Sequence, residues 1–496
     1  MEFVQNFPFF SIILSLFSGP ISSVLSGKAA KILNTIVIGL VSLMSVAVLV
    51  FTYHTGTFYV YWMGHFPAPW GNEIRAGVLE AGMALFFCII MLLSLLGGRK
   101  KLLQEVEHSK IHYYYILTDL LLCSLLALVY TNDIFSAYVF VEINTIAACG
   151  LIMIRQNGRT IEAAVRYMIM SLLGSGMFLL GICMLYDITG HLLMSNIREQ
   201  VAILSASGEY RIPLLVTISL ICVGLAIKSA LFPFHTWLPD AYGYSTVSSA
   251  AMLSSLVSKG YLFLLIKIIY RVIGFEIFHD SRIINVLFVF GLMGMIFGSL
   301  SAIKENDIRR MISFSSVAQI GYIYMGIGLG TNVAMVASVF HILSHAATKS
   351  MLFIAAIGLT DVSNGSRKFQ DLTGAGYRHK IAGVAFTAGS LSMVGIPLFS
   401  GFISKLLFAQ SAVMNQGKML PALIVLAIST ILNAIYFMKT VIRIYTPVEE
   451  KGECITMRQE KLYAFTCICF IVLNVVLGVL SQPIVDWIQT GLHMFA

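Results

Sequence analysis

Residues 223–240 read VGLAIKSALFPFHTWLPD, an apolar segment that is interrupted by Lys228, Pro233 and Pro239. The surrounding apolar run, residues 212–236, is long enough to cross the roughly 30 Å hydrocarbon core of a bilayer. Proline at membrane depth frees backbone carbonyls, which is tolerated only where protein or water can satisfy them. The segment therefore predicts a membrane helix that breaks near Pro233 and carries a charge beside the break.

Similar apolar runs recur along the whole chain. Of the 496 residues, 58% are hydrophobic and only 11% are charged, whereas soluble domains carry about 25% charged residues. The runs lack the period-two alternation of a membrane barrel, so the sequence predicts an all-α polytopic membrane protein. The fourteen expected spans lie near residues 6–25, 32–52, 76–97, 112–130, 134–154, 163–186, 212–236, 246–270, 284–303, 310–329, 333–358, 382–411, 420–442 and 462–490.

The basic residues between the spans predict the topology. If the N-terminus lies outside, the inner connections collect 19 Lys and Arg, Lys451 among them, and the outer connections hold 6, Arg271 among them. This bias follows the positive-inside rule and places both termini outside. Because the basic residues form no patch with interleaved aromatic residues, the net charge of +8 does not indicate a nucleic-acid partner. Seven basic residues remain inside the spans: Arg166, Lys228, Lys259, Lys267, Lys349, Lys405 and Lys439.

Three of these lysines, Lys228, Lys259 and Lys405, lie deep in their spans, and Glu142 is the matching acid. A lysine at the bilayer centre costs about 2.5–3.5 kcal/mol on insertion scales, so it is seldom retained without a use. Burial disfavours the charged form and a nearby carboxylate favours it. A Glu–Lys pair of variable spacing is therefore a candidate proton switch, and the alternative is a static ion pair that holds the helices together.

The eleventh span adds His341, His345 and Lys349 at positions i, i+4 and i+8. On a helix these side chains form one stripe. Histidine titrates near neutral pH, so the stripe is a candidate proton wire. Two histidines without a third ligand nearby in the sequence are weak evidence for a metal, and we expect none.

Further polar residues are weaker candidates for the same relay. They are Glu80, Asp119, Arg166 and His235, the last beside Pro233 at the expected helix break. Lys267 and Lys439 lie nearer to span ends, where lysines extend to the membrane interface.

A second breaker segment, residues 394–405, reads VGIPLFSGFISK and ends on Lys405, 177 residues after Lys228. Breaks at corresponding positions of two halves mark the transport path in inverted-repeat transporters. We therefore expect two inverted five-helix repeats, with helices 7 and 12 broken. The expected units are residues 1–110 (helices 1–3), 111–271 (the first repeat), 281–445 (the second repeat) and 446–496 (helix 14).

Several longer motifs extend through the same region. They are KSALFPFHTWLPDA (228–241), DIF (133–135) followed by Glu142, IRRM (308–311) leading to SSVAQIGY (315–322), HAATK (345–349) before Leu352 and Phe353, and GIP (395–397) followed by GFISK (401–405).

In order and type these motifs resemble the proton-pumping antiporter-like family. That family comprises the large membrane-arm subunits of respiratory complex I, the A-type and D-type subunits of Mrp sodium/proton antiporters, and related subunits of membrane-bound hydrogenases. Lysine at position 259 looks closer to the Mrp D-type and hydrogenase subunits. The resemblance implies a fourteen-helix fold in which Glu142 and Lys228 form the switch, Lys259 is the central relay and Lys405 stands at one channel end.

The sequence thus favours a proton-translocating subunit, with or without sodium exchange, of a multisubunit complex in a prokaryotic cell membrane. Its partners would be other membrane subunits. We expect no cofactor on this chain, because its cysteines lack iron–sulfur spacing and no glycine-rich phosphate loop follows a strand. Any redox chemistry, as in an NADH- or ferredoxin-linked oxidoreductase or hydrogenase, would lie on the partners. The alternatives are a stand-alone transporter of a small solute and a structural scaffold.

Overall fold

The computed structural model describes residues 2–67, 71–208, 210–448 and 454–495. Thirteen helices in these residues are long and apolar enough to cross a membrane, and a shorter apolar helix covers Lys380–Val394. The only sheet in the described part of the chain pairs β1 (Tyr59–Trp62) antiparallel with β2 (Glu73–Ala76). The prediction of an all-α polytopic membrane protein is therefore confirmed.

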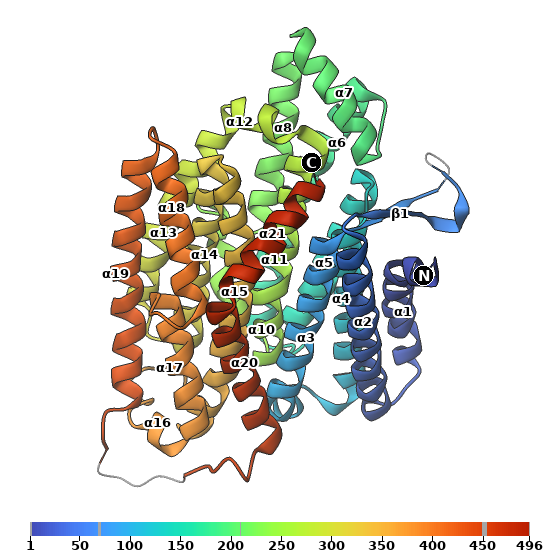
Figure 1. Ribbon diagram of the computed structural model, residues 1–496. Coiled ribbons are helices and arrows are strands. Elements are labelled where there is room, and N and C mark those ends of the chain that lie inside the picture. Colours follow the sequence, from blue (N-terminus) through green and yellow to red (C-terminus); the bar gives the residue numbers. More distant parts are fainter. Residues whose placement is uncertain (1, 68–70, 209, 449–453, 496) are drawn as a thin grey trace.

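The long helices run up and down through one bundle (Figure 1). They are α1 (Phe7–Ser23), α2 (Gly27–Thr55), α3 (Val78–Glu105), α4 (Ile111–Tyr130), α5 (Ile134–Met153), α6 (Gly158–Thr189), α8 (Arg211–Lys228), α10 (Val247–Met252) with α11 (Ser258–Ile268), α13 (Ile283–Lys304), α14 (Ile308–Leu329), α15 (Asn332–Asp361), α17 (Lys380–Val394), α18 (Ser400–Met414), α19 (Met419–Ile444) and α20 (Lys461–Val479). Shorter elements are η1 (Glu2–Asn6), η2 (Met63–His65), η3 (His108–Lys110), α7 (Met194–Ser207), η4 (Phe234–Trp237), α9 (Leu238–Tyr244), the π-helical turns η5 (Leu253–Val257) and η6 (Ile269–Ile273), α12 (Phe275–Asp280), α16 (Ala375–Arg378) and α21 (Ser481–Phe495).

The core of the bundle surrounds α15 and the α10–α11 span. In the most apolar stretch of each of these two spans, every residue is buried. In the corresponding stretches of α1, α2 and α19, only 33% of the residues are buried. Because the outer helices are apolar on their exposed faces as well, they suit contact with lipid. The central helices instead contact only protein, so polar side chains on them face other helices.

Two spans are interrupted where the sequence carries proline and glycine. α8 ends at Lys228, and Ala230 then adopts a left-handed backbone with φ of +64° before η4 and α9 continue the crossing. α17 ends at Val394, and α18 begins at Ser400 after Leu398, whose φ is +89°. The two breaker segments of the sequence therefore coincide with non-helical backbone inside the bundle.

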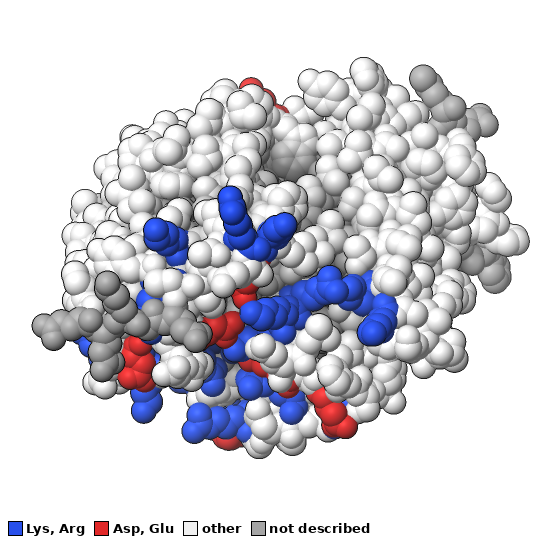
Figure 2. Space-filling view, turned by 90° about the horizontal axis from the view of Figure 1, so that it is seen from below, with Lys and Arg blue, Asp and Glu red and all other residues white. Residues whose placement is uncertain are grey.

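Basic residues gather at one end of the bundle. Figure 2 shows Lys and Arg gathered at the end that carries α16, and Figure 1 shows both chain termini away from that end. Lys451, which the charge count assigns to this side, lies outside the described residues.

The last expected span is not one helix. α20 ends at Val479, and α21 continues as a separate amphipathic helix that packs against α3 and α15. The connection between α6 and α8 contains α7, which projects beyond the membrane-spanning helices at the upper end of the molecule (Figure 1).

Candidate functional site

The structure brings Glu142 of α5 and Lys228 of α8 together inside the bundle. Lys228 Nζ lies 3.3 Å from Glu142 Oε1. The lysine side chain is fully buried, while 25% of the Glu142 side chain remains accessible. Ser175 of α6 also donates a hydrogen bond to Glu142 Oε1. The acid is therefore the more accessible partner of the pair.

Lys228 has a second partner on the same helix as its acid. Its Nζ donates a 2.6 Å hydrogen bond to Thr145 Oγ1, one turn beyond Glu142 on α5. Behind Thr145 stands Tyr261, whose hydroxyl donates to Asn144 Oδ1 at 2.9 Å and lies 3.5 Å from Thr145 Oγ1. The ammonium group therefore lies between a carboxylate and a neutral hydroxyl network and bonds to both.

The helix break explains why a lysine is stable at this position. Lys228 is the last residue of α8, where the unsatisfied carbonyls give the helix end a partial negative charge that favours a cation. The next residue, Ser229, shares a 2.7 Å hydrogen bond with the Tyr324 hydroxyl of α14. This bond ties the broken end of α8 to the second half of the bundle.

Lys259, in the first turn of α11, is fully buried. Its Nζ donates to the carbonyl of Ser254, inside the π-helical turn η5. π-Helical turns are rare and occur frequently at functional sites. The ammonium group of Lys259 is thus hydrogen-bonded to a backbone carbonyl of the adjacent π-helical turn and not to a carboxylate.

The stripe on α15 is present and buried. The rings of His341 and His345 stack with centroids 5.8 Å apart. His341 Nδ1 contacts Ser404 Oγ, and Lys349 Nζ donates to Ile312 O at 2.9 Å and to Ser315 of α14. In contrast, neither ring nitrogen of His345 has a hydrogen-bond partner among the described residues.

Lys405 lies on α18, beyond the second break. Its Nζ donates a 2.8 Å hydrogen bond to Val394 O, at the C-terminal end of α17. It also lies 5.7 Å from the ring centroid of Tyr322, which stacks on His341. Lys405 and the α15 stripe therefore meet at one place in the bundle.

The weaker candidates lie apart from these groups. Asp119 faces α1 and α2, where it accepts hydrogen bonds from Asn34 (2.7 Å) and Ser22 (3.5 Å). His235 stacks on Phe232, with ring centroids 5.3 Å apart, and its Nδ1 has no partner among the described residues.

Arg166 lies on the exposed face of α6: 54% of its side chain is exposed, and it pairs with Glu162 and Asp240, both at 2.6 Å. Its part in the relay stays a prediction.

Glu80 has a partner that the sequence analysis missed. It pairs with Arg271, and both side chains are at most 2% exposed. The charge count places Arg271 in an outer connection, but this residue lies in η6, which extends its span to Ile273, and its guanidinium covers the Phe495 ring at 4.5 Å. The i+4 spacing from Lys267 on an apolar helix is the signal that would have placed it in the span.

Two other basic residues lie in environments that differ from the prediction. Lys267 does not extend to the interface, since it is fully buried and donates to Val129 O (2.8 Å) and Leu128 O (3.1 Å) at the end of α4. Arg309, counted as a loop charge, is buried and donates to the carbonyls of Tyr242 and Ser245. Lys439 is exposed on α19.

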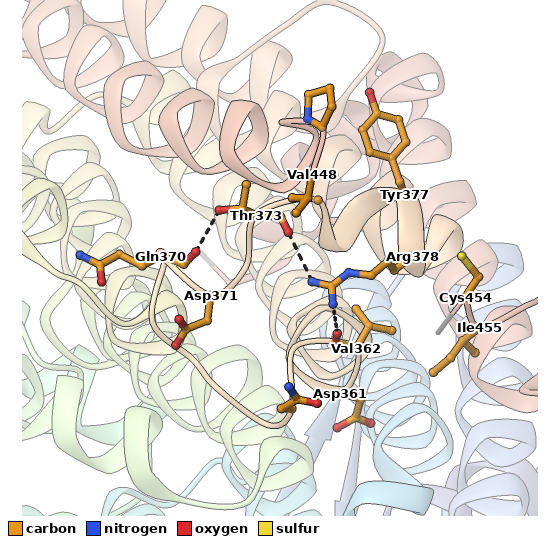
Figure 3. A pocket seen from close by; sticks show the side chains of 13 residues that line it. Asp361, Val362, Gln370, Asp371, Thr373, Tyr377, Arg378, Val448, Cys454 and Ile455 are labelled. Atoms are coloured by element: carbon orange, nitrogen blue, oxygen red, sulfur yellow. Dashed lines mark hydrogen bonds between the residues drawn. The ribbon is translucent and has the colours of Figure 1, made fainter. Parts of the chain in front are cut away.

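A cavity of about 1020 Å³ opens at the basic end (Figure 3), and its lining contains none of the buried candidate lysines. Its most prominent cation, Arg378, is already bound to Val362 O and Thr373 O in the wall. Asp361 pairs with Lys101, and Asp371 accepts a hydrogen bond from Ser366. These charged groups are engaged within the protein, so the cavity gives no reason to relocate the candidate site.

Comparison with known proteins gives the family. Residues 131–432 match the family described as the transmembrane region of NADH:quinone oxidoreductase and Mrp antiporters, and the chain belongs to this family. The resemblance seen in the motifs is thus confirmed. The matched region contains Glu142, Lys228, Lys259, the α15 stripe and Lys405.

Three relatives illustrate the range of the family. The chain is 33% identical over 388 residues to NADH-quinone oxidoreductase subunit N of Desulforudis audaxviator, a match covering 78% of this chain and 75% of that protein. It is 25% identical to the D-type subunit of the Na(+)/H(+) antiporter of Alkalihalophilus pseudofirmus, covering 86% and 84%. A chain of the membrane-bound sulfane sulfur reductase, an archaeal respiratory membrane complex, superposes with a TM-score of 0.88 at 26% identity, covering 100% of this chain and 98% of that one.

Proposed function

We propose that this chain is the proton-translocating, antiporter-like subunit of a multisubunit membrane complex. The observation that carries the proposal is the position of Lys228, which lies at the end of a broken helix between the Glu142 carboxylate and the Thr145 hydroxyl. The relatives support it, since they are named as subunits of a quinone oxidoreductase and of a sodium/proton antiporter. Those names disfavour the alternative of a stand-alone solute transporter.

In this proposal Lys228 is the switch. Its ammonium bonds to both the Glu142 carboxylate, which stabilises the charged form, and the neutral Thr145 hydroxyl. Because burial penalises the charged form, movement toward Thr145 favours release of the proton into the interior of the bundle. The return of Lys228 to Glu142 favours reprotonation from the accessible side of the acid.

The released proton then passes to Lys259 and the α15 stripe, and Lys405 receives it at the second break. The free ring nitrogens of His345 support this route, because a histidine without fixed partners can both accept and donate a proton. Buried polar atoms without protein partners are usually satisfied by ordered water. We therefore include water in the links between His345 and its neighbouring lysines.

We also propose that residues 111–271 and 281–445 form two inverted five-helix repeats, between an N-terminal unit (1–110) and a C-terminal unit (446–496). α4 begins at the basic end of the bundle and α13 begins at the other end (Figure 1), which supports the inversion.

The membrane orientation follows from the same charge asymmetry. With the basic end inside, both termini face the outside of a prokaryotic plasma membrane. The transported ion is the proton, and exchange with sodium is supported by the name of the antiporter relative.

The test replaces Lys228 with Ala in the assembled complex and measures proton translocation in membrane vesicles. We expect translocation to be lost while the complex still assembles, because the switch is gone but its surroundings remain. Lys439→Ala, which removes an exposed lysine from α19, is the matched control and should translocate normally. Full translocation by Lys228→Ala would reject the proposal.

A further inference from the structure

A group of buried side-chain oxygens, unused by the proton path, surrounds the second helix break. Asn474 Oδ1 of α20 accepts hydrogen bonds from Thr348 Oγ1 of α15 (2.7 Å), Ser400 Oγ of α18 (3.2 Å) and Ser392 Oγ of α17 (3.3 Å). Ser344 Oγ lies 2.8 Å from Ser400 Oγ. All five side chains are at most 3% exposed. We call this group the hydroxyl cage.

The cage presents oxygen atoms only. Asn474 Nδ2 donates to Phe470 O of its own helix at 3.1 Å, and this bond turns the amide oxygen toward the hydroxyls. An amide oxygen has two lone pairs, yet three hydroxyls converge on this one. Thr348 Oγ1 is in addition 2.8 Å from Ser344 O and 3.3 Å from Ser392 Oγ. The four hydroxyl groups of the cage have fewer protons than there are close oxygen–oxygen contacts. Some of these contacts are therefore not hydrogen bonds at any one time.

The non-helical backbone between α17 and α18 packs closely against the hydroxyl cage. Ser392 and Ser400 flank the non-helical residues between α17 and α18. A Cβ at Gly401 would collide with Ser392 O, and one at Gly478, a turn beyond Asn474, would collide with Leu398 O. The cage is thus next to the C-terminal end of a half-helix, where the backbone carries partial negative charge.

We infer that the hydroxyl cage is a binding site for a sodium ion. Hard cations prefer oxygen ligands, and unwound carbonyls together with half-helix C-terminal ends coordinate sodium in transporters with broken helices. Because the cage holds no carboxylate, it suits a monovalent cation better than calcium or magnesium, whose sites are built on carboxylates. The inference rests on the proposed function, for which it supplies the location of the second ion.

The test measures equilibrium binding of ²²Na⁺ to the purified complex that contains this chain. Thr348→Val keeps the shape of the side chain but removes one oxygen from the cage, and we expect it to weaken binding about tenfold or more, as for the loss of one hydrogen bond to a charged group. Thr466→Val is the matched control, because that buried hydroxyl bonds only to Leu462 O of its own helix. Asn474→Asp places a carboxylate in the cage and should tighten binding.

The site is rejected if the parent complex binds no sodium, or if Thr348→Val and Thr466→Val bind it equally. In that case the oxygens form a hydroxyl network that only holds the break together. Lys228→Ala separates the two proposals, since it should lose proton translocation and keep sodium binding. The opposite result is also possible to recognise. If Lys228→Ala still translocates protons, the proton switch is refuted. If adding Thr348→Val to that variant then abolishes sodium binding, the sodium site is nevertheless supported.

Discussion

The ammonium nitrogen of Lys228 lies 2.6 Å from the hydroxyl oxygen of Thr145, closer than its 3.3 Å separation from Glu142. A simple buried ion pair would place the lysine nearest to its acid. Here a neutral hydroxyl, one turn along the same helix, competes for the same charge. The structure thus shows Lys228 hydrogen-bonded to both groups at once, with the shorter contact to Thr145.

The first prediction concerns this competition. A hydrogen bond to a charged group is worth about 1.5–3 kcal/mol, so Thr145→Val should shift Lys228 toward Glu142 and hold the pair together. We expect proton translocation to slow by about tenfold, since each 1.4 kcal/mol changes a rate tenfold. The measurement is the initial rate of proton uptake by vesicles that contain the assembled complex.

Thr440→Val on α19 is the control for this variant, because Thr440 is buried and bonds only to Tyr436 O of its own helix. It should leave the rate unchanged. Equal rates for Thr145→Val and Thr440→Val would mean that Thr145 plays no part in the switch.

The second prediction distinguishes the two histidines of α15. His345→Leu removes no protein hydrogen bond, so the complex should keep its thermal stability. Translocation should nevertheless fall by about 10²-fold or more, the usual contribution of a positioned proton-transfer group. His341→Leu also loses the contact with Ser404 and should destabilise the complex by about 1 kcal/mol.

Thermal unfolding and proton uptake, measured on the same preparations, decide this prediction. Normal translocation by His345→Leu would remove that residue from the path. A loss of stability as large as that of His341→Leu would show instead that the ring has a structural role.

The arrangement of the main site could be predicted from the sequence, because lysines in apolar runs are too costly to be accidental. The helix breaks follow directly from Pro233 and Pro397, because proline cannot continue the hydrogen-bond ladder of a helix. The apolar runs hold three deep lysines and so do not say which of them pairs with Glu142. The pairing with Lys228, 86 residues away, is what the family resemblance implies, and the structure contains that contact.

Other features could not be predicted, and the reasons are physical. The charge count places Arg271 outside its span because hydropathy falls near the end of that span. The same fall is seen when the chain leaves the membrane and when it continues into a buried π-helical turn, as it does here. Hydropathy alone therefore cannot distinguish the two cases. Thr145 and the hydroxyl cage escape prediction because serine and threonine can bond to the carbonyl four residues earlier on their own helix, and so are common in membrane helices. Only the packing shows which hydroxyls converge with those of other helices.

The third prediction tests the buried Glu80–Arg271 pair. Removing one partner of such a pair leaves an uncompensated charge and costs about 3–5 kcal/mol. Arg271→Leu should therefore lower the stability of the complex strongly, and the double variant Glu80→Leu/Arg271→Leu should recover much of the loss. The measurement is a double-mutant cycle by thermal unfolding, and additive losses would contradict the assigned coupling.

The last prediction concerns pH and Glu460, which precedes α20 at the basic end of the bundle. Its carboxylate accepts hydrogen bonds from Lys100 of α3 and, at 3.4 Å, from the His379 ring at the start of α17. Partial burial raises the pKa of Glu460, but the bond and charge of Lys100 outweigh it, so the pKa lies below its ordinary value of 4.5. The ionised form is thus favoured in the folded protein.

A carboxyl group with a depressed pKa contributes stability above its ordinary pKa, and this contribution is lost as the pH falls through the folded value. The difference in unfolding temperature between the parent and Glu460→Gln should therefore be constant from pH 7 to about 5 and shrink below 4.5. The contribution should stay below about 1 kcal/mol, because the Lys100 side chain is 65% exposed. Thermal unfolding of both proteins across this range measures it, and a difference that persists unchanged at about pH 3.5 would show that Glu460 acts through shape rather than charge.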